Sequence, residues 1–125
     1  MAKRVYDLEE RLVEFAAKDV EVVEALPGTR AGNYIAGQLI RYGLAPALLY
    51  GEAQAAASLD DFVHKKKIIL KKLKEARVCL KLIICKEMIK PIVRLDGLRN
   101  ECEQLIKIIA ASIETAEKNK KKSRD

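Results

Sequence analysis

A chain of 125 residues, half of them hydrophobic, is long enough to build one hydrophobic core. Aromatic residues make up only 5% of the chain and glycine and proline are few, which excludes a β-sandwich or barrel and favours an all-α fold with an aliphatic core. The formal net charge of +6 permits a polyanionic partner without requiring one.

The first predicted helix runs from about Asp7 to Leu26. Asp7 and Glu10 have the D-x-x-E spacing of a helix start. The helix stops at Leu26–Gly28, because proline cannot continue the hydrogen-bond ladder and glycine accepts the left-handed cap. We expect residues 1–4, which precede it, to form a short flexible basic arm.

The second predicted helix runs from about Arg30 to Ala57, with Thr29 as its cap. It is rich in glycine and alanine, whose small side chains let neighbouring helices approach closely. Pro46 lies inside it, where a proline removes one backbone donor and crowds the carbonyl four residues earlier. This predicts a kink near Pro46. The alternative is two short helices that separate near Gly43–Pro46.

The third predicted helix starts at Ser58 and continues to about Met88. A serine followed by the acidic pair Asp60 and Asp61 suits the positive end of a helix dipole. Helical spacing aligns one set of apolar residues on the core side: Phe62, Ile69, Leu73, Ala76, Leu80, Ile83 and Ile84. A separate basic stripe contains Lys67, Lys71, Lys74 and Lys81.

The fourth predicted helix begins near Pro91 and carries an apolar side from Ile92 to Ile113. Residues 119–125 are expected to form a flexible basic end. Four long amphipathic segments with short connectors predict an up-and-down four-helix bundle, and residues 1–125 are expected to form a single domain.

Charge is distributed unevenly along the chain. The segment Val5–Ala25 holds seven acidic and two basic residues, a net charge of −5, whereas Ser58–Lys90 holds ten basic and four acidic residues, a net charge of +6. The basic segment could bind nucleic acid, or it could face the acidic first helix of another subunit. The sequence leaves both interpretations open.

The residues that could support catalysis or metal binding are sparse. Cys79, Cys85 and Cys102 form no C-x-x-C pair, and no His/Cys pair has ligand spacing, so no metal or other cofactor is expected. His64, the one histidine, lies among lysines without a nucleophile. We therefore expect a protein without enzymatic activity. In the absence of a recognisable signal peptide, reduced, buried thiols in a cytoplasmic protein are the default.

Several short motifs occur in the order typical of one family. They are Gln38-Leu39-Ile40-Arg41-x-Gly43, Glu52-Ala53, Ser58-x-x-Asp61-Phe62, Lys74-Glu75-Ala76-Arg77 with Leu80, and Cys102-Glu103-x-Leu105-Ile106-x-Ile108. From about Leu8 to Asn119 the chain resembles the four-helix-bundle family of intervening-sequence proteins, whose reading frames lie inside bacterial large-subunit (23S) ribosomal RNA genes.

The resemblance implies an up-and-down bundle that assembles into a closed homo-oligomeric ring, often a pentamer, with no established enzymatic activity. A related branch serves as the accessory protein of diversity-generating retroelements, whose basic ring is thought to bind nucleic acid and a reverse transcriptase. Family members tend to place Ser, Thr and Asn just after the helix-2 glycine. This chain has Leu44–Leu49 there, so any role of those polar side chains is not transferred.

Two sets of residues are candidates for function. The polar set is interpreted as an internal or inter-subunit network that fixes helix register. Its members are Gln38, Arg41, Glu52, Glu75 and Arg77. The second set is expected to attract RNA or DNA phosphates without reading sequence, because no aromatic platform accompanies it. Its members are Lys65, Lys66, Lys67, Lys71, Lys72, Lys74, Lys81, Lys118, Lys120, Lys121, Lys122 and Arg124.

Some apolar residues lie outside the predicted core stripes. These are Tyr34, Tyr42 and Tyr50 in the second helix and Ile68, Cys79 and Leu82 in the third. Such a surplus predicts a subunit interface. The sequence thus predicts an oligomer that binds RNA or DNA, and the resemblance implies a role as the accessory of a reverse transcriptase or another nucleic-acid enzyme. The alternative is a structural or protein-binding oligomer with no nucleic-acid role.

Overall fold

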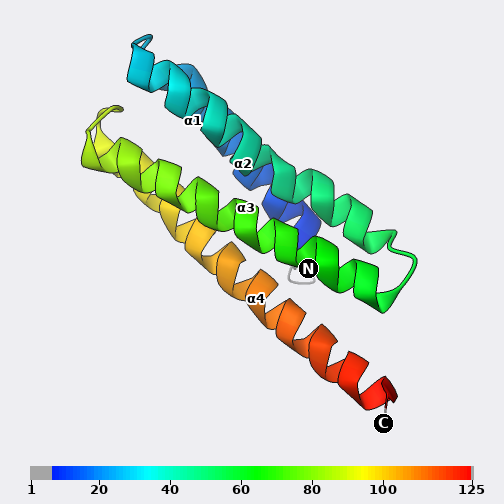
Figure 1. Ribbon diagram of the computed structural model, residues 1–125. Coiled ribbons are helices and arrows are strands. Elements are labelled where there is room, and N and C mark those ends of the chain that lie inside the picture. The colour runs from blue at the N-terminus through cyan, green and yellow to red at the C-terminus, as the bar shows by residue number, and fades with distance from the viewer. Residues whose placement is uncertain (1–6, 125) are drawn as a thin grey trace, which may run out of the picture.

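The computed structural model describes residues 7–124, with side chains as far as Lys122, and shows a bundle of four helices (Figure 1). They are α1 (Leu8–Ala25), α2 (Arg30–Gln54), α3 (Leu59–Cys85) and α4 (Asp96–Arg124), with a short 3₁₀ helix, η1 (Ile92–Leu95), before α4. Each helix runs antiparallel to the one before it (Figure 1). Residues 7–124 contain no strand, so the predicted all-α, four-helix architecture is confirmed.

The first three helices begin at their predicted caps. In each, the side-chain oxygen of the capping residue accepts a hydrogen bond from a backbone N–H three residues later, which satisfies a donor that has no partner inside the helix. The pairs are Glu10 N to Asp7 Oδ1 (2.7 Å), Gly32 N to Thr29 Oγ1 (3.0 Å) and Asp61 N to Ser58 Oγ (3.1 Å).

Three helices differ from their predicted course. α4 begins at Asp96 rather than near Pro91, because Ile92–Leu95 form η1. α2 runs without interruption through the buried Pro46, so the alternative of two short helices is wrong; the kink stays a prediction. α3 ends at Cys85 rather than Met88, because Glu87 adopts a left-handed conformation with φ 49°. The N–H groups of Glu87 and Met88 then bond back to the carbonyls of Ile84 and Ile83, which closes the helix.

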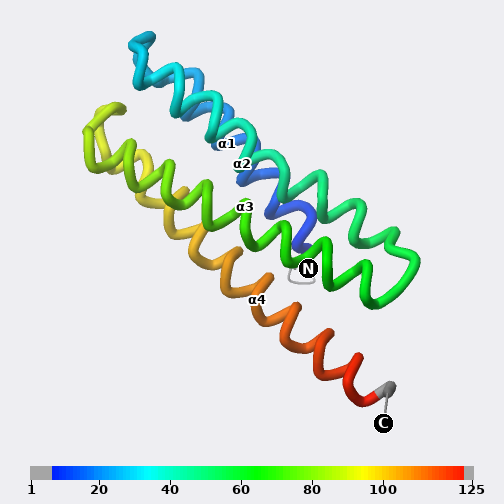
Figure 2. The backbone as a smooth tube through the Cα atoms, in the orientation of Figure 1, coloured from blue at the N-terminus to red at the C-terminus, as the bar shows by residue number. Residues whose placement is uncertain are grey.

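The two expected flexible ends have different outcomes. Residues 119–124 continue α4 as helix rather than leaving it. Residues 1–4 lie outside the described part of the chain. In Figure 2 the last turns of α4 extend beyond the first turn of α1, so this part of α4 has α3 beside it but not α1.

The core is aliphatic, as the composition predicts. Its largest fully buried side chains come from every helix and from η1 and include one aromatic residue, Phe15. The others are Leu12, Leu39, Ile69, Leu73, Leu80, Ile83, Leu95, Leu105 and Ile109, together with Pro46 and one carboxylate, Asp19. The buried positions of α3 include Val63 and Lys66, whereas Phe62 and Ile84, which were expected there, are only partly buried.

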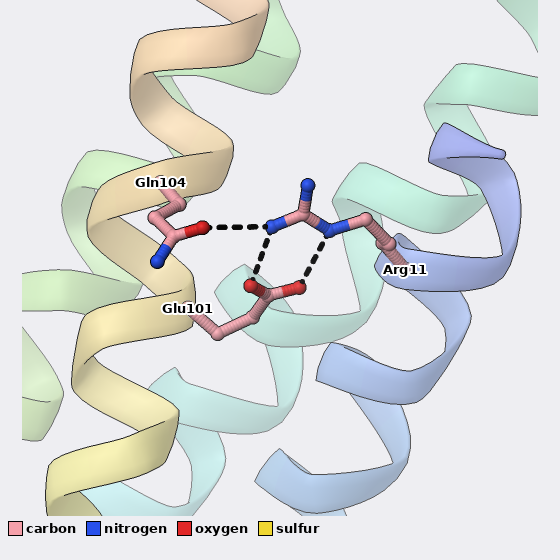
Figure 3. A network of polar contacts seen from close by, with 3 residues as sticks. All are labelled: Arg11, Glu101 and Gln104. Carbon is pink, nitrogen blue, oxygen red and sulfur yellow. Dashed lines mark hydrogen bonds and ion pairs between the residues drawn. The ribbon is translucent and has the colours of Figure 1, made fainter. Parts of the chain in front are cut away.

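A polar clasp connects α1 to α4 (Figure 3). Arg11 donates from Nε to Glu101 Oε2 at 3.0 Å and from Nη2 to Glu101 Oε1 at 2.6 Å, and Nη2 also donates to Gln104 Oε1 at 3.3 Å. A two-pronged guanidinium–carboxylate contact fixes direction as well as distance. The clasp therefore sets the position of α1 along α4.

Candidate nucleic-acid interface

Five of the predicted phosphate-binding lysines already have carboxylate partners. Lys65 Nζ lies 3.6 Å from Glu52 Oε1 and 3.7 Å from Asp61 Oδ1. Lys67 Nζ lies 2.8 Å from Glu117 Oε1. The other pairs are Lys72 with Glu75 (3.7 Å), Lys118 with Glu114 (3.3 Å) and Lys120 with Asp60. Lys65, Lys67 and Lys120 find carboxylates on a neighbouring helix, because antiparallel packing brings distant parts of the sequence together. The partners of Lys72 and Lys118 lie within one turn of the same helix.

Lys66 is not on the surface at all. Its side chain is 3% exposed, and Nζ donates to Ser112 Oγ at 3.1 Å. The ammonium also lies 4.8 Å from the ring centre of Tyr50 and 4.9 Å from that of Phe62, where the negative faces of the rings stabilise a cation. Burial lowers the pKa of Lys66. Lys66 is therefore an internal structural residue and is unavailable to phosphate.

The lysines that remain available lie on the outer side of α3. Among the described side chains, no carboxylate lies within ion-pairing distance of Lys71, Lys74 or Lys81. Lys71 and Lys74 line an open surface hollow of about 450 Å³. Leu70 and Val78 form the apolar part of its lining, and Lys67, Glu75 and Arg77 complete it.

Arginines on α3 and α4 extend this charge. Arg77 Nη1 donates to Glu103 Oε1 at 2.9 Å, and this bond holds the pKa of Glu103 below its usual range, with the charges of Lys81 and Arg99 acting in the same direction. Arg99 lies one turn before Glu103 on α4 and so close to this ion pair. Sequence reasoning missed it, because nothing local in α4 indicates which side faces α3.

We call this surface the α3–α4 basic face. It consists of Lys67, Lys71, Lys74, Arg77, Lys81 and Arg99 with the carboxylates of Glu75, Glu103 and Glu117. Six cations and three carboxylates give a net charge of +3. The other two predicted residues without a described partner, Lys121 and Lys122, are exposed near the end of α4. The side chain of Arg124 lies outside the described part of the structure.

The predicted polar set divides into separate contacts. Gln38 Nε2 donates to the Tyr34 hydroxyl at 2.8 Å, and Arg41 is exposed. Glu52, Glu75 and Arg77 pair with Lys65, Lys72 and Glu103 respectively. Within the described chain, no hydrogen bond or ion pair joins one member of the set to another. An inter-subunit role for these residues stays a prediction.

The most unusual polar group is one that the sequence did not single out. Asp19 on α1 is 0% exposed, and neither of its carboxylate oxygens has a hydrogen-bond partner. Burial raises its pKa to about 8. The backbone of α2 approaches it at Gly43, where a side chain would collide with the carboxylate. A carboxyl group in this position is held as the neutral acid at neutral pH.

The cysteines are less uniform than predicted. Cys102 is buried and donates from Sγ to the Leu73 carbonyl at 3.4 Å, and burial raises its pKa to about 12. Cys79 is partly buried and Cys85 is exposed. Within the described residues, no group of three or more His, Cys, Asp or Glu side chains is arranged to hold a metal ion.

Part of the predicted apolar surplus is used inside the bundle. Tyr42, Tyr50 and Cys79 pack against the core, whereas Tyr34 and Leu82 are exposed. Other apolar side chains are also exposed on α2 and α3. They are Ile40, Leu48, Leu59 and Val78. None of the helices in the described part of the chain combines the length and apolar character needed to cross a membrane.

The chain is similar in structure to a solved protein. The solved structure is the crystal structure of a protein of unknown function from the S23 ribosomal protein family of Bacteroides thetaiotaomicron, with a TM-score of 0.78 and 25% sequence identity. The match covers 86% of this chain and 98% of that one. No family model and no curated protein matches the sequence. Over most of its length, the chain is therefore structurally similar to a protein of the S23 ribosomal protein family.

Proposed function

We propose that this protein is a non-enzymatic binder of RNA or DNA, which it holds by the phosphates through the α3–α4 basic face. The observation that carries the proposal is that Lys71, Lys74 and Lys81 lie on the exposed side of α3. None of the three has a described carboxylate partner. Cations that the fold leaves uncompensated are free to exchange their counterions for phosphate.

The spacing of the charges suits a phosphate backbone rather than bases. Lys67, Lys74 and Lys81 are seven residues apart, so they recur on nearly the same side of α3 at intervals of about 10.5 Å. The residues that make up the face include no aromatic side chain on which a base could stack. The predicted mode of binding is therefore electrostatic and independent of sequence.

Reversing the three uncompensated lysines is expected to abolish this binding. Lys71→Glu, Lys74→Glu and Lys81→Glu together remove the phosphate contacts and repel the ligand, so affinity for a labelled 20-base-pair RNA duplex should fall more than ~100-fold. With three phosphate contacts, raising salt from 50 to 200 mM should weaken wild-type binding by about 40-fold. Fluorescence anisotropy over a salt series measures both effects.

The matched control reverses three exposed lysines outside the face, Lys18, Lys86 and Lys90, and changes the net charge equally. The control should retain most of the affinity if the site is local. Equal loss in both variants would attribute binding to net charge alone. Absence of wild-type binding to duplex or single-stranded RNA or DNA, even at low salt, would contradict the proposal.

An RNA ligand is the favoured form of the proposal, because the structural neighbour comes from a family named for a ribosomal protein. A more specific version of this proposal is that the protein acts as the accessory of a reverse transcriptase, as in diversity-generating retroelements. That version rests on the family resemblance alone.

The second candidate is a structural or protein-binding homo-oligomer, such as a pentameric ring. It is favoured by apolar side chains that one bundle leaves exposed on α2 and α3, including Leu48 (70%), Val78 (61%) and Leu82 (45%). Light scattering during the salt series separates the two candidates. An oligomer that dissociates as salt rises and binds no nucleic acid would assign the basic face to assembly.

A further inference from the structure

One end of the α3–α4 basic face is covered by an anion of the protein itself. Lys67 lines the same hollow as Lys71 and Lys74, but its ammonium is held by Glu117 of α4 at 2.8 Å. The hydrogen bond from Lys67 lowers the pKa of Glu117, which favours the charged carboxylate. A carboxylate and a phosphate offer a lysine the same kind of acceptor, so they compete for it.

A second ion pair holds this part of α4 in place without Glu117. Lys120 of α4 pairs with Asp60 at the start of α3, so the two pairs cross the helix interface with opposite polarity. Both members of the Lys67–Glu117 pair are about half exposed, and exposed ion pairs contribute little to stability. Glu117 is therefore dispensable for the fold, and its effect on Lys67 can be tested separately.

We propose that Glu117 is an internal competitor that occupies Lys67 in the free protein and gives it up when a nucleic-acid phosphate binds. This inference rests on the proposed function and adds a means of regulating the same site. While Glu117 holds Lys67, the hollow presents Lys71 and Lys74 alone, and weak or short polyanions gain less from binding. A long nucleic acid that reaches Lys67 replaces one intramolecular contact with one phosphate contact.

The test compares Glu117→Gln with Glu114→Gln. Both substitutions raise the net charge by one, but among the described side chains Glu114 pairs with Lys118, four residues along the exposed side of α4, and with no lysine of α3. Glu117→Gln should tighten binding of the labelled 20-base-pair RNA duplex about two- to fivefold more than Glu114→Gln at 50 mM salt, and should steepen its salt dependence by about one phosphate contact. Adding Lys67→Gln to Glu117→Gln should cancel that gain, because the lysine that Glu117→Gln releases is then absent.

The outcomes distinguish this inference from the proposed function. If Glu117→Gln and Glu114→Gln bind alike while the triple lysine reversal abolishes binding, the competitor role is wrong and the binding site stands. If the gain survives Lys67→Gln, it comes from net charge and the competitor role is again wrong. If neither the wild type nor any variant binds RNA or DNA at low salt, the proposed function fails and the competitor role fails with it. Circular dichroism of each variant confirms that the helices remain.

Discussion

Gly43→Ala is expected to destabilise the bundle, although alanine is the better helix former. The added Cβ would lie 2.8 Å from Cγ and 2.9 Å from Cβ of Asp19, closer than non-bonded carbons approach. Asp19 is short and fully buried, so its atoms cannot swing away, and α1 and α2 must move apart. Overpacking of this kind costs about 1–3 kcal/mol, against a helix-propensity gain of ~1 kcal/mol. We expect a net loss of about 1 kcal/mol in urea unfolding.

Gly37→Ala is the matched control, because it lies in the same helix and a Cβ there would meet nothing within 4 Å. It should stabilise the protein by ~0.5–1 kcal/mol. Combining Gly43→Ala with Asp19→Ala should recover part of the loss, with a coupling of at least ~1 kcal/mol, because the two positions are in contact. Equal effects of the two glycine substitutions would show that the close approach carries no energetic weight.

The fold was predictable because its signals are local. The side chains of Asp7, Thr29 and Ser58 cap helices that lie directly after them in the sequence, and the apolar spacing of each segment fixes its buried side. What local pattern could not supply was the exact end of α3, where Glu87 takes a left-handed conformation that glycine usually adopts. The uninterrupted α2 also depended on how the bundle packs around Pro46, which sequence spacing does not encode.

The candidate site was only half predictable, because its electrostatics are decided between helices. Lys67 and Lys71 look alike in sequence, yet the register of α3 against α4 gives Glu117 to one of them and leaves the other without a described partner. Lys66 did carry a readable signal, since it lies seven residues before the core residue Leu73 and so on the same side of α3. Lys66 was nevertheless grouped with the neighbouring lysines, Lys65 and Lys67, and so was predicted to be exposed.

Asp19 should make the stability of the protein fall as pH rises through the neutral range. Its pKa is about 8 in the folded state, against 3.8 for the ordinary carboxyl group, and burial is the cause. Between these values the folded protein binds the proton more tightly than the unfolded chain. The contribution of Asp19 to the free energy of unfolding is therefore fully present below about pH 4 and is lost as pH rises to about 8. Between these two pKa values the free energy of unfolding falls by ~1.4 kcal/mol per pH unit, which is about 3 kcal/mol from pH 5 to 7.

Asp19→Asn keeps the shape of the side chain and cannot ionise. Its free energy of unfolding, relative to that of the wild type, should therefore rise by about 3 kcal/mol from pH 5 to 7 and level off above about pH 8. The facing thiols of Cys79 and Cys102 do not confound the comparison, because both have raised pKa values and are present in both proteins. Glu24→Gln, an exposed change on the same helix, should leave the slope unaltered. A difference between Asp19→Asn and wild type that stays constant across this range would mean that the Asp19 carboxylate finds water or a cation in solution. The close approach of Gly43 would then enclose an ionised group, and the destabilisation expected from Gly43→Ala should itself depend on pH.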